Sequence, residues 1–336
     1  MDILTVAELT KFLLVPGASR ELAEVAAGGA IVVVLDETHA TELDDALRVA
    51  VETLPHPLVG VFGEQPPEST RSLADLVDVA LSGASAEAGL ARLLERIAAR
   101  PLASAALAVL LRGAARRSVG QGLAAESAVY SMLQAGPEFQ AWLAARPAPR
   151  QRDNDMSVLV NRTGETLRIT LFRPEMRNAF NARMREELLD ALAVAAADPS
   201  IASVVLDGEG PSFCSGGDLD EFGTAPDPAT AHVVRLGRSA GAAIYALAPR
   251  VTAQIHGACF GAGIELPAFA GRVVARADTV IALPEVGMGL IPGAGGTVSL
   301  PRRIGRQRTA FLALSGARVD ARAALAFGLV DEVEEE

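Results

Sequence analysis

The sequence predicts an α/β protein with a mainly helical N-terminal region, and three observations support this prediction. The 336-residue chain is 50% hydrophobic and 21% charged, which is typical of a globular protein with a sizeable core. Residues 146–155 (RPAPRQRDND) form a polar, proline-containing stretch of the kind that links two regions. After it, apolar strand patterns alternate with amphipathic helix patterns, which indicates parallel strands joined by helical crossovers. We therefore predict two regions, residues 1–150 and residues 156–336.

The elements of the second region can be predicted in order. Two alternating segments, 157–161 and 166–172, flank Gly164 and predict a β-hairpin. The next segment, 181–197, has the periodicity of an amphipathic helix, for which Asn181 is a suitable N-cap. The elements expected after it are a buried strand at 202–206, a helix over about 228–247, a strand at 251–256, a glycine-rich turn into a further helix, two short strands within 272–282 and mainly helical structure to Leu325.

The N-terminal region repeats part of this pattern. Residues 31–36 (IVVVLD) resemble 202–207, and residues 57–63 resemble 250–257. Asp78 follows Gly63 by 15 residues, as Arg272 follows Gly257. Short apolar strands also recur by chance, so the repeat is a hypothesis for the structure to examine.

Composition and charge argue against several classes of protein. The formal net charge of −11 argues against a nucleic-acid-binding protein, which normally has a clustered basic face. It also weakens the case for binding to an anionic membrane surface. The chain has only two cysteines, Cys214 and Cys259, and its first residues lack a basic, cleavable leader, so we expect no disulfides and a cytoplasmic location. No apolar run approaches the roughly 18 residues of a membrane helix.

Common cofactor motifs are also missing. Gly261 and Gly263 lie between a strand and a helix, but Leu266 stands where a dinucleotide fingerprint needs its third glycine. The only lysine is Lys11, which rules out a Walker A loop, and no GxSxG elbow occurs. The four histidines lack the spacing of metal ligands, so no metal is expected.

Four segments of the second region carry the chemistry: FRPEMRNAFN (172–181), FCSGGDLDEF (213–222), HGACFGAGIEL (256–266) and LPEVGMGLIPGAGGT (283–297). In order and spacing they resemble the crotonase superfamily (enoyl-CoA hydratase/isomerase) over residues 157–333, and the last segment resembles enoyl-CoA hydratase in particular. The resemblance implies a spiral of ββα repeats, an acyl-CoA or enoyl-CoA substrate with no separate cofactor, and a homotrimer or dimer of trimers.

The family motif assigns an oxyanion hole to the backbone N–H groups of Gly217 and Ala262. A thioester carbonyl gathers negative charge when its α-carbon is deprotonated or its β-carbon is attacked, and two N–H donors stabilise that charge. Small residues let the carbonyl approach the main chain closely, and Ala262 opens a helix whose N-terminus favours an anion. The family more often has glycine at the position of Ala262, but the donor belongs to the backbone.

Two glutamates, Glu265 and Glu285, match the catalytic positions of the family. Either one alone could be an ordinary residue at a helix start, and only their order and pairing favour catalysis. With two carboxyls, one can activate water while the other protonates the α-carbon, which favours hydration of an enoyl-CoA over isomerisation or decarboxylation. The resemblance assigns coenzyme A binding to Arg177, Asn178, Ala179, Phe180, Ser215, Gly216, Asp218 and Leu219.

Three features depart from the family pattern. Pro267 follows Glu265 closely, and Gly271 stands where many relatives have an aspartate. The family normally continues past residues 328–333 into helices that cover the active site and mediate trimer contacts, whereas here residues 87–145 look like that segment. We therefore expect residues 1–150 to be a degenerate crotonase copy whose terminal helices cap the core, in the same chain or across subunits. A non-catalytic assembly partner of an active homologue remains the alternative from another class.

Overall fold

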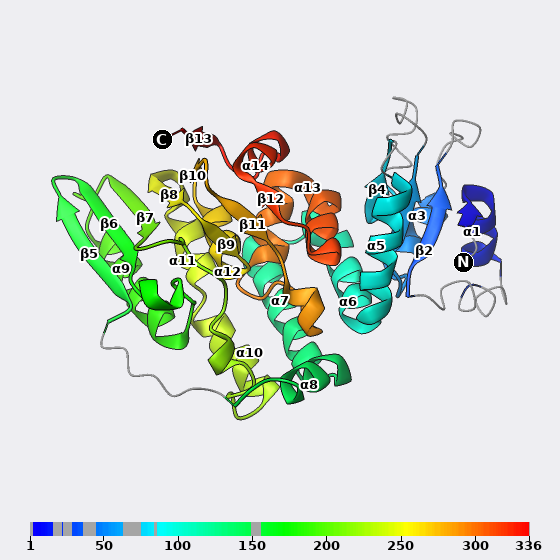
Figure 1. The fold of residues 1–336 in the computed structure, drawn as a ribbon, viewed down its shortest axis with the longest axis horizontal. Helices are drawn as coiled ribbons and strands as arrows, with labels where there is room; N and C mark the ends of the chain where they lie inside the picture. The colour runs from blue at the N-terminus through cyan, green and yellow to red at the C-terminus, as the bar shows by residue number, and fades with distance from the viewer. Residues whose placement is uncertain are drawn as a thin grey trace.

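The computed structural model describes residues 3–15, 22, 29–35, 45–62, 75–83, 86–148 and 156–335. Residues 149–155 of the expected linker, and Asp36 and Gly63 of the expected repeat, lie outside the described residues. The described chain has two sheet-containing regions, with helices α5, α6, α7 and α13 between the four-stranded N-terminal sheet and the six-stranded C-terminal sheet (Figure 1).

The C-terminal region has the α/β architecture expected from the sequence. Its six-stranded sheet has the order β13-β10-β8-β7-β6-β5, and all its neighbours are parallel except the β5–β6 hairpin. A smaller sheet has the order β12-β11-β9. The elements are β5 (Val158–Thr163), β6 (Thr166–Leu171), η5 (Pro174–Met176), α9 (Ala182–Ala197), β7 (Ser203–Gly208), η6 (Leu219–Glu221), α10 (Pro228–Gly237), α11 (Ala240–Ala246), η7 (Ala248–Arg250), β8 (Val251–Ile255), β9 (Ala258–Phe260), α12 (Ala262–Glu265), η8 (Pro267–Phe269), β10 (Arg272–Arg276), β11 (Val280–Ala282), η9 (Glu285–Met288), α13 (Gly296–Ser315), β12 (Val319–Asp320), α14 (Ala321–Phe327) and β13 (Glu332–Glu334).

Local sequence explains where these helices begin and end. Asn181 caps α9 as expected, because its side chain accepts a hydrogen bond of 2.8 Å from the N–H of Met184. The single helix expected over about 228–247 is wrong. The chain leaves helical geometry at Arg238, and the side chain of Ser239 caps a second helix by accepting from the N–H of Ala242.

The N-terminal region contains a four-stranded parallel sheet in addition to the expected helices. The strands follow the order β1-β2-β3-β4. The three segments that resemble the C-terminal region form β2, β3 and β4, which neighbour one another as β7, β8 and β10 do in the larger sheet. The elements are β1 (Ile3–Thr5), α1 (Val6–Leu14), β2 (Ile31–Val34), α3 (Asp45–Glu52), β3 (Leu58–Val61), β4 (Val79–Leu81), α5 (Ala86–Ala99), α6 (Pro101–Arg112), η4 (Ala114–Arg116), α7 (Val119–Gln134) and α8 (Pro137–Ala144).

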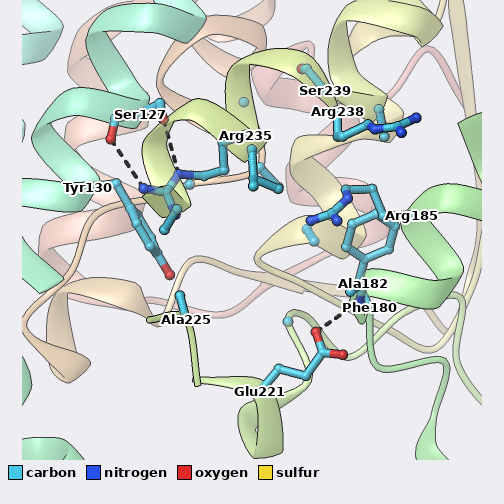
Figure 2. Close-up of a pocket in the computed structure, with 18 of the residues that line it drawn as sticks. Ser127, Tyr130, Phe180, Ala182, Arg185, Glu221, Ala225, Arg235, Arg238 and Ser239 are labelled. Carbon is cyan, nitrogen blue, oxygen red and sulfur yellow. Dashed lines mark hydrogen bonds between the residues drawn. The ribbon is translucent and has the colours of Figure 1, made fainter. Parts of the chain in front are cut away.

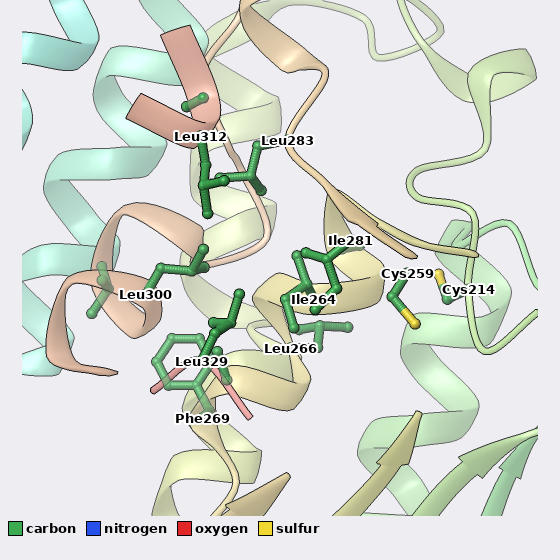
Figure 3. Close-up of a cluster of buried hydrophobic side chains, with 14 of the residues drawn as sticks. Cys214, Cys259, Ile264, Leu266, Phe269, Ile281, Leu283, Leu300, Leu312 and Leu329 are labelled. Carbon is green, nitrogen blue, oxygen red and sulfur yellow. The ribbon is translucent and has the colours of Figure 1, made fainter. Parts of the chain in front are cut away.

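The two regions share one hydrophobic core. Side chains alternate across β2, so Val32 faces the cluster that extends through the C-terminal region, whereas Ile31 and Val33 face a separate cluster with α1 and α3. The shared cluster continues beneath α12 and α13, where Figure 3 shows Ile264, Leu283 and Leu312 among its members.

A buried ion pair also joins the regions. Asp78, which directly precedes β4, accepts hydrogen bonds from Arg112 of α6 at 2.6 Å and from Arg306 of α13 at 3.3 Å. Asp78 is 1% exposed, so these guanidiniums balance a charge that water does not reach. The N-terminal sheet is thereby fixed against α13. Among the described residues, no helix is both long enough and apolar enough to cross a membrane.

Candidate active site

A cavity of about 490 Å³ lies between the two regions. Its walls come from α7, α10, the loop that follows β7, α12 and the turn before α13. Three buried glutamates line it, Glu126, Glu265 and Glu285, and so do Gly217 and Ala262. Figure 2 shows the side of the cavity formed by α7, α9 and α10. The structure thus brings both sequence-predicted glutamates and both predicted backbone donors to one cavity.

The N–H groups of Gly217 and Ala262 are available to a ligand. The N–H of Phe180 donates to the Gly216 carbonyl at 2.8 Å, and the Phe180 carbonyl accepts from the N–H of Asp218 at 2.8 Å. The N–H of Gly217, which lies between Gly216 and Asp218, is left unused. Ala262 begins α12, where backbone N–H groups have no partner within the helix. Within the described part of the chain, neither N–H has a hydrogen-bond acceptor.

Close backbone packing holds these two donors together. The N–H of Phe260 donates to the carbonyl of Cys214 at 3.1 Å, so the loop that contains Gly217 runs beside the strand that leads to Ala262. A side chain on Gly263 would place its Cβ 2.1 Å from the Cys214 carbonyl oxygen. Glycine at 263 is therefore required for α12 to lie against the loop.

Glu265 lies at the end of α12, and the turn before α13 fixes its carboxyl. Its Oε2 accepts hydrogen bonds from the N–H of Ala294 at 2.8 Å and of Gly296 at 2.7 Å. Its main-chain carbonyl accepts from Ser299 Oγ at 2.8 Å. The α-helix ends at this residue, and a 3-10 turn starts at Pro267, so the proline interrupts no longer helix.

Glu285 approaches the same cavity from η9. A Cβ on Gly261 would lie 2.3 Å from Oε1 of Glu285, and Gly261 has a positive φ of 48°, so only glycine fits between the two acids. Oε2 of Glu285 is buried and has no hydrogen-bond partner among the described residues. The described protein therefore leaves this oxygen unused, in a residue that lines the cavity.

Burial shifts the proton affinity of all three carboxyls. Burial raises the pKa of Glu285 to about 8, and the nearby charge of Glu126 adds to the effect. Burial, then the charges of Glu285 and Glu126, raise the pKa of Glu265 well above its usual range. The two backbone N–H groups on Glu265 oppose that rise, whereas among the described residues no other residue donates to the Glu285 carboxyl. The arrangement favours a protonated Glu285 near neutral pH.

The residues assigned to coenzyme A divide into two groups. Phe180 and Asp218 line the cavity, and Leu219 lines a smaller adjoining cavity of about 240 Å³. The others stabilise the loops instead of lining the main cavity: Arg177 and Ser215 pair through their backbones, Gly216 accepts from Phe180, Ala179 is buried, and Asn178 uses its amide internally.

Asn178 shows why these loops keep their shape. It has a positive φ of 52° and is fully buried. Its Oδ1 accepts from the N–H of Arg173 at 2.7 Å, and its Nδ2 donates to the carbonyls of Glu209 and Ser212 at 2.8 and 2.9 Å. Arg173 pairs in turn with buried Asp218 at 2.9 Å. These side chains hold the backbone next to Gly217 in place.

Three residues at the site were not predicted from the sequence: Glu126, Tyr130 and Arg235. Glu126 and Tyr130 lie four residues apart on α7, hence on one helix face, and burial raises the pKa of the Tyr130 hydroxyl. Arg235 reaches from α10 to donate to Ser127 Oγ at 3.1 Å and stacks 4.8 Å from the Tyr130 ring centre (Figure 2). The only signal was the helix spacing of Glu126 and Tyr130 within the expected capping segment.

Other reactive groups do not form a second centre. Cys214 and Cys259 are free and buried, and burial raises the pKa of the Cys214 thiol to about 12, so both behave as small apolar residues (Figure 3). In the described ranges, no group of three His, Cys, Asp or Glu side chains could hold a metal ion. His256 contacts the Gly210 carbonyl at 2.9 Å at the end of β8.

Comparison with known proteins places the similarity in the C-terminal region. Residues 162–336 match the family model for enoyl-CoA hydratase/isomerase. The 2,3-dehydroadipyl-CoA hydratase of Escherichia coli (strain K12) is 35% identical over 176 residues, which cover 52% of this chain and 68% of that protein. YngF of Bacillus subtilis (strain 168), whose name refers to enoyl-CoA hydratases and isomerases, is 37% identical over 49% of this chain and 64% of its own length.

A solved structure agrees with these matches. The enoyl-CoA hydratase from Thermoplasma volcanium GSS1 is 37% identical and superposes with a TM-score of 0.51 over 54% of this chain and 73% of that chain. The matched parts therefore span about half of this chain and about two thirds of the two curated relatives. Glu126 lies outside the segment that matches the family model.

Proposed function

Because the chain belongs to the enoyl-CoA hydratase/isomerase family, we propose that it is an enoyl-CoA hydratase, which adds water across the 2,3 double bond of an enoyl-CoA thioester. One observation carries the proposal. A single cavity holds two buried carboxyls, Glu265 and Glu285, together with two backbone N–H groups that no protein acceptor uses.

The proposed reaction begins at the thioester carbonyl. The N–H groups of Gly217 and Ala262 would receive its oxygen and stabilise the enolate that forms when water attacks the β-carbon. Donors of this kind each contribute about 3 kcal/mol to the transition state in other oxyanion holes. Ala262 adds the favourable N-terminal end of α12.

The two glutamates would then divide the proton transfers. Glu265 is our candidate for orienting and deprotonating water, because two backbone N–H groups fix its Oε2 and oppose the rise in its pKa that burial causes. Glu285, protonated near neutral pH and free at Oε2, would deliver a proton to the α-carbon. The water would give its hydroxyl group to the β-carbon and its proton to Glu265, while Glu285 gives its proton to the α-carbon. The two carboxyls thereby exchange protonation states and reset through solvent.

The remaining expectations stay proposals. Coenzyme A would enter past Phe180 and Asp218 at the cavity wall and Leu219 at the adjoining cavity. We propose a homotrimer or dimer of trimers in the cytoplasm, and light scattering coupled to size exclusion would determine the subunit number. The N-terminal region as a degenerate copy of the core is likewise a proposal, supported by the shared order of β2–β3–β4 and β7–β8–β10.

Product analysis tests the proposed function. The full chain is incubated with crotonyl-CoA and with a longer enoyl-CoA, and the products are identified by mass spectrometry. Hydration adds the mass of one water, double-bond isomerisation leaves the mass unchanged, and decarboxylation of a suitable acyl-CoA lowers it. A 3-hydroxyacyl-CoA product is expected. No conversion of any of these thioesters would instead favour an assembly partner without its own activity.

A further inference from the structure

Glu126 of α7 binds residues 294–297, where the preceding turn enters α13, with both of its carboxyl oxygens. Oε1 accepts from the N–H of Gly295 at 2.7 Å, and Oε2 accepts from the N–H and the hydroxyl of Thr297 at 2.9 and 2.7 Å. The side chain is 2% exposed, so water does not compete for these bonds. A carboxyl with three donors on two oxygens is held in one orientation.

The same turn supplies the donors that hold Glu265. The N–H groups of Ala294 and Gly296 point to Glu265, and the alternate N–H groups of Gly295 and Thr297 point to Glu126. Residues 294–297 are therefore held between two buried carboxyls, at a helix N-terminus whose N–H groups would otherwise lack partners. A displacement of the turn away from Glu126 would move the donors of Glu265 as well.

Close packing leaves this turn little room to compensate. A Cβ on Gly296 would lie 2.7 Å from Oε2 of Glu265, and a Cβ on Gly295 would lie 2.3 Å from the Phe269 ring. On the other side, a Cβ on Gly122 would lie 2.9 Å from Val298, so α7 runs directly against the first turn of α13. This approach is what lets Glu126 reach the turn.

We propose that Glu126 is a positioning residue: it holds residues 294–297 and, through their N–H groups, orients the carboxyl of Glu265 for proton transfer. This inference rests on the proposed function, and it makes the N-terminal region part of the working site. The segment that matches the family model starts after α7, so this carboxyl comes from outside the matched segment.

Charge gives Glu126 a second, measurable effect. The charged and titratable groups that face it are Tyr130 on its own helix, Arg235 on α10, Glu265 on α12 and Glu285 on η9. Burial raises the pKa of Glu126 to about 7, against the hydrogen bonds from Thr297 and Gly295. Its negative charge helps to raise the pKa of Glu285, so loss of that charge lowers the pKa of the proposed acid.

The test compares kcat, KM and the pH–rate profile of three full-length variants with the wild type. Glu126→Ala removes the carboxyl, Glu126→Gln keeps one acceptor oxygen, and Met132→Ala trims an exposed side chain of the same helix as a control. A misplacement of about 1 Å can cost about 100-fold in rate. We expect kcat to fall about 10- to 100-fold in Glu126→Ala with KM changed much less, and a smaller fall in Glu126→Gln.

The pH readout separates positioning from a general loss of structure. In Glu126→Gln the alkaline limb of the kcat profile should move to lower pH, because Glu285 loses a neighbouring negative charge. Wild-type kcat in Glu126→Ala, an unmoved alkaline limb in Glu126→Gln, or an equal loss in Met132→Ala would overturn the proposal.

A second readout does not depend on hydration. The infrared carbonyl band of protonated carboxyls is followed as pH rises, in the wild type and in Glu126→Gln. If the wild type is inactive on every enoyl-CoA, the proposed function is refuted. The infrared titration would still decide the role of Glu126. Loss of the band at lower pH in the variant supports the inference, and an unchanged titration of the remaining carboxyls overturns it.

Discussion

Replacing Glu285 by glutamine is expected to stabilise the folded chain while it removes the proposed acid. Burial raises the pKa of Glu285 from its ordinary value of 4.5 to about 8. The folded chain therefore keeps this carboxyl protonated at neutral pH, whereas the unfolded chain ionises it. Because the folded pKa is the higher one, the stability linked to this group is fully present below pH 4.5 and is lost as pH rises towards 8.

The magnitude follows from the two pKa values. Each pH unit between them is equivalent to about 1.4 kcal/mol, so the folded state loses about 3 kcal/mol by pH 7 and about 5 kcal/mol above pH 8. Glutamine has nearly the same shape and cannot ionise, so Glu285→Gln recovers this free energy. Its amide group replaces Oε2, an atom that already lacks a partner, so hydrogen bonding changes little.

Urea unfolding between pH 5 and pH 8, followed by the fluorescence of the single tryptophan, Trp142, measures the effect. The free energy of unfolding of Glu285→Gln should exceed that of the wild type by a margin that grows by about 1.4 kcal/mol per pH unit. Glu165→Gln, which removes an exposed glutamate from the β5–β6 turn, is the control and should match the wild type throughout. A margin independent of pH, or a variant less stable than the wild type at pH 7, would refute the reasoning.

Four further predictions follow from the same contacts. Gly261→Ala should lower the rate of hydration about 100-fold, because its methyl group would lie 2.3 Å from the Glu285 carboxyl. Gly164→Ala is the control and should keep full activity in the same assay, because Gly164 also has a positive φ but a Cβ there would meet no atom within 4 Å. The rate of hydration should fall as pH rises through about 8, since Glu285 donates only when protonated, and a rate level to far higher pH would contradict this. Asp78→Ala should lower the free energy of unfolding in urea by about 3 kcal/mol or more, because it leaves two arginines at a buried site without their partner. The fragment 156–336 should be insoluble or inactive, since it exposes the face of α13 that α5, α6 and α7 cover; a soluble, fully active fragment would rule this out.

The sequence predicted those parts of the site that depend on local order along the chain. Glu265 and Glu285 flank two short strands, and the return of the chain between β9 and β11 brings both carboxyls to the cavity. The hairpin around Gly164 and the cap at Asn181 are local features, and both are confirmed. Alternating strands and helices were enough to predict the parallel sheet.

Long-range contacts could not be predicted in the same way. Nothing in the local pattern around Glu126 shows that α7 packs on α13, because this packing depends on Gly122 and Val298, which lie far apart in the sequence. The break between α10 and α11 was missed because apolar residues continue through it, while Ser239 offers a competing cap. Asn178 was assigned to coenzyme A, but its buried amide bonds only to the protein's own backbone in the described structure.

The most direct test of two-glutamate hydration is the rate at which the ultraviolet absorbance of an enoyl-CoA disappears, for the wild type, Glu265→Gln and Glu285→Gln. Crotonyl-CoA and a longer enoyl-CoA serve as substrates for the full-length chain. Hydration by the wild type that falls about 100-fold or more in both variants is the expected result. Wild-type rates in either variant would contradict the assignment of both proton transfers to these residues.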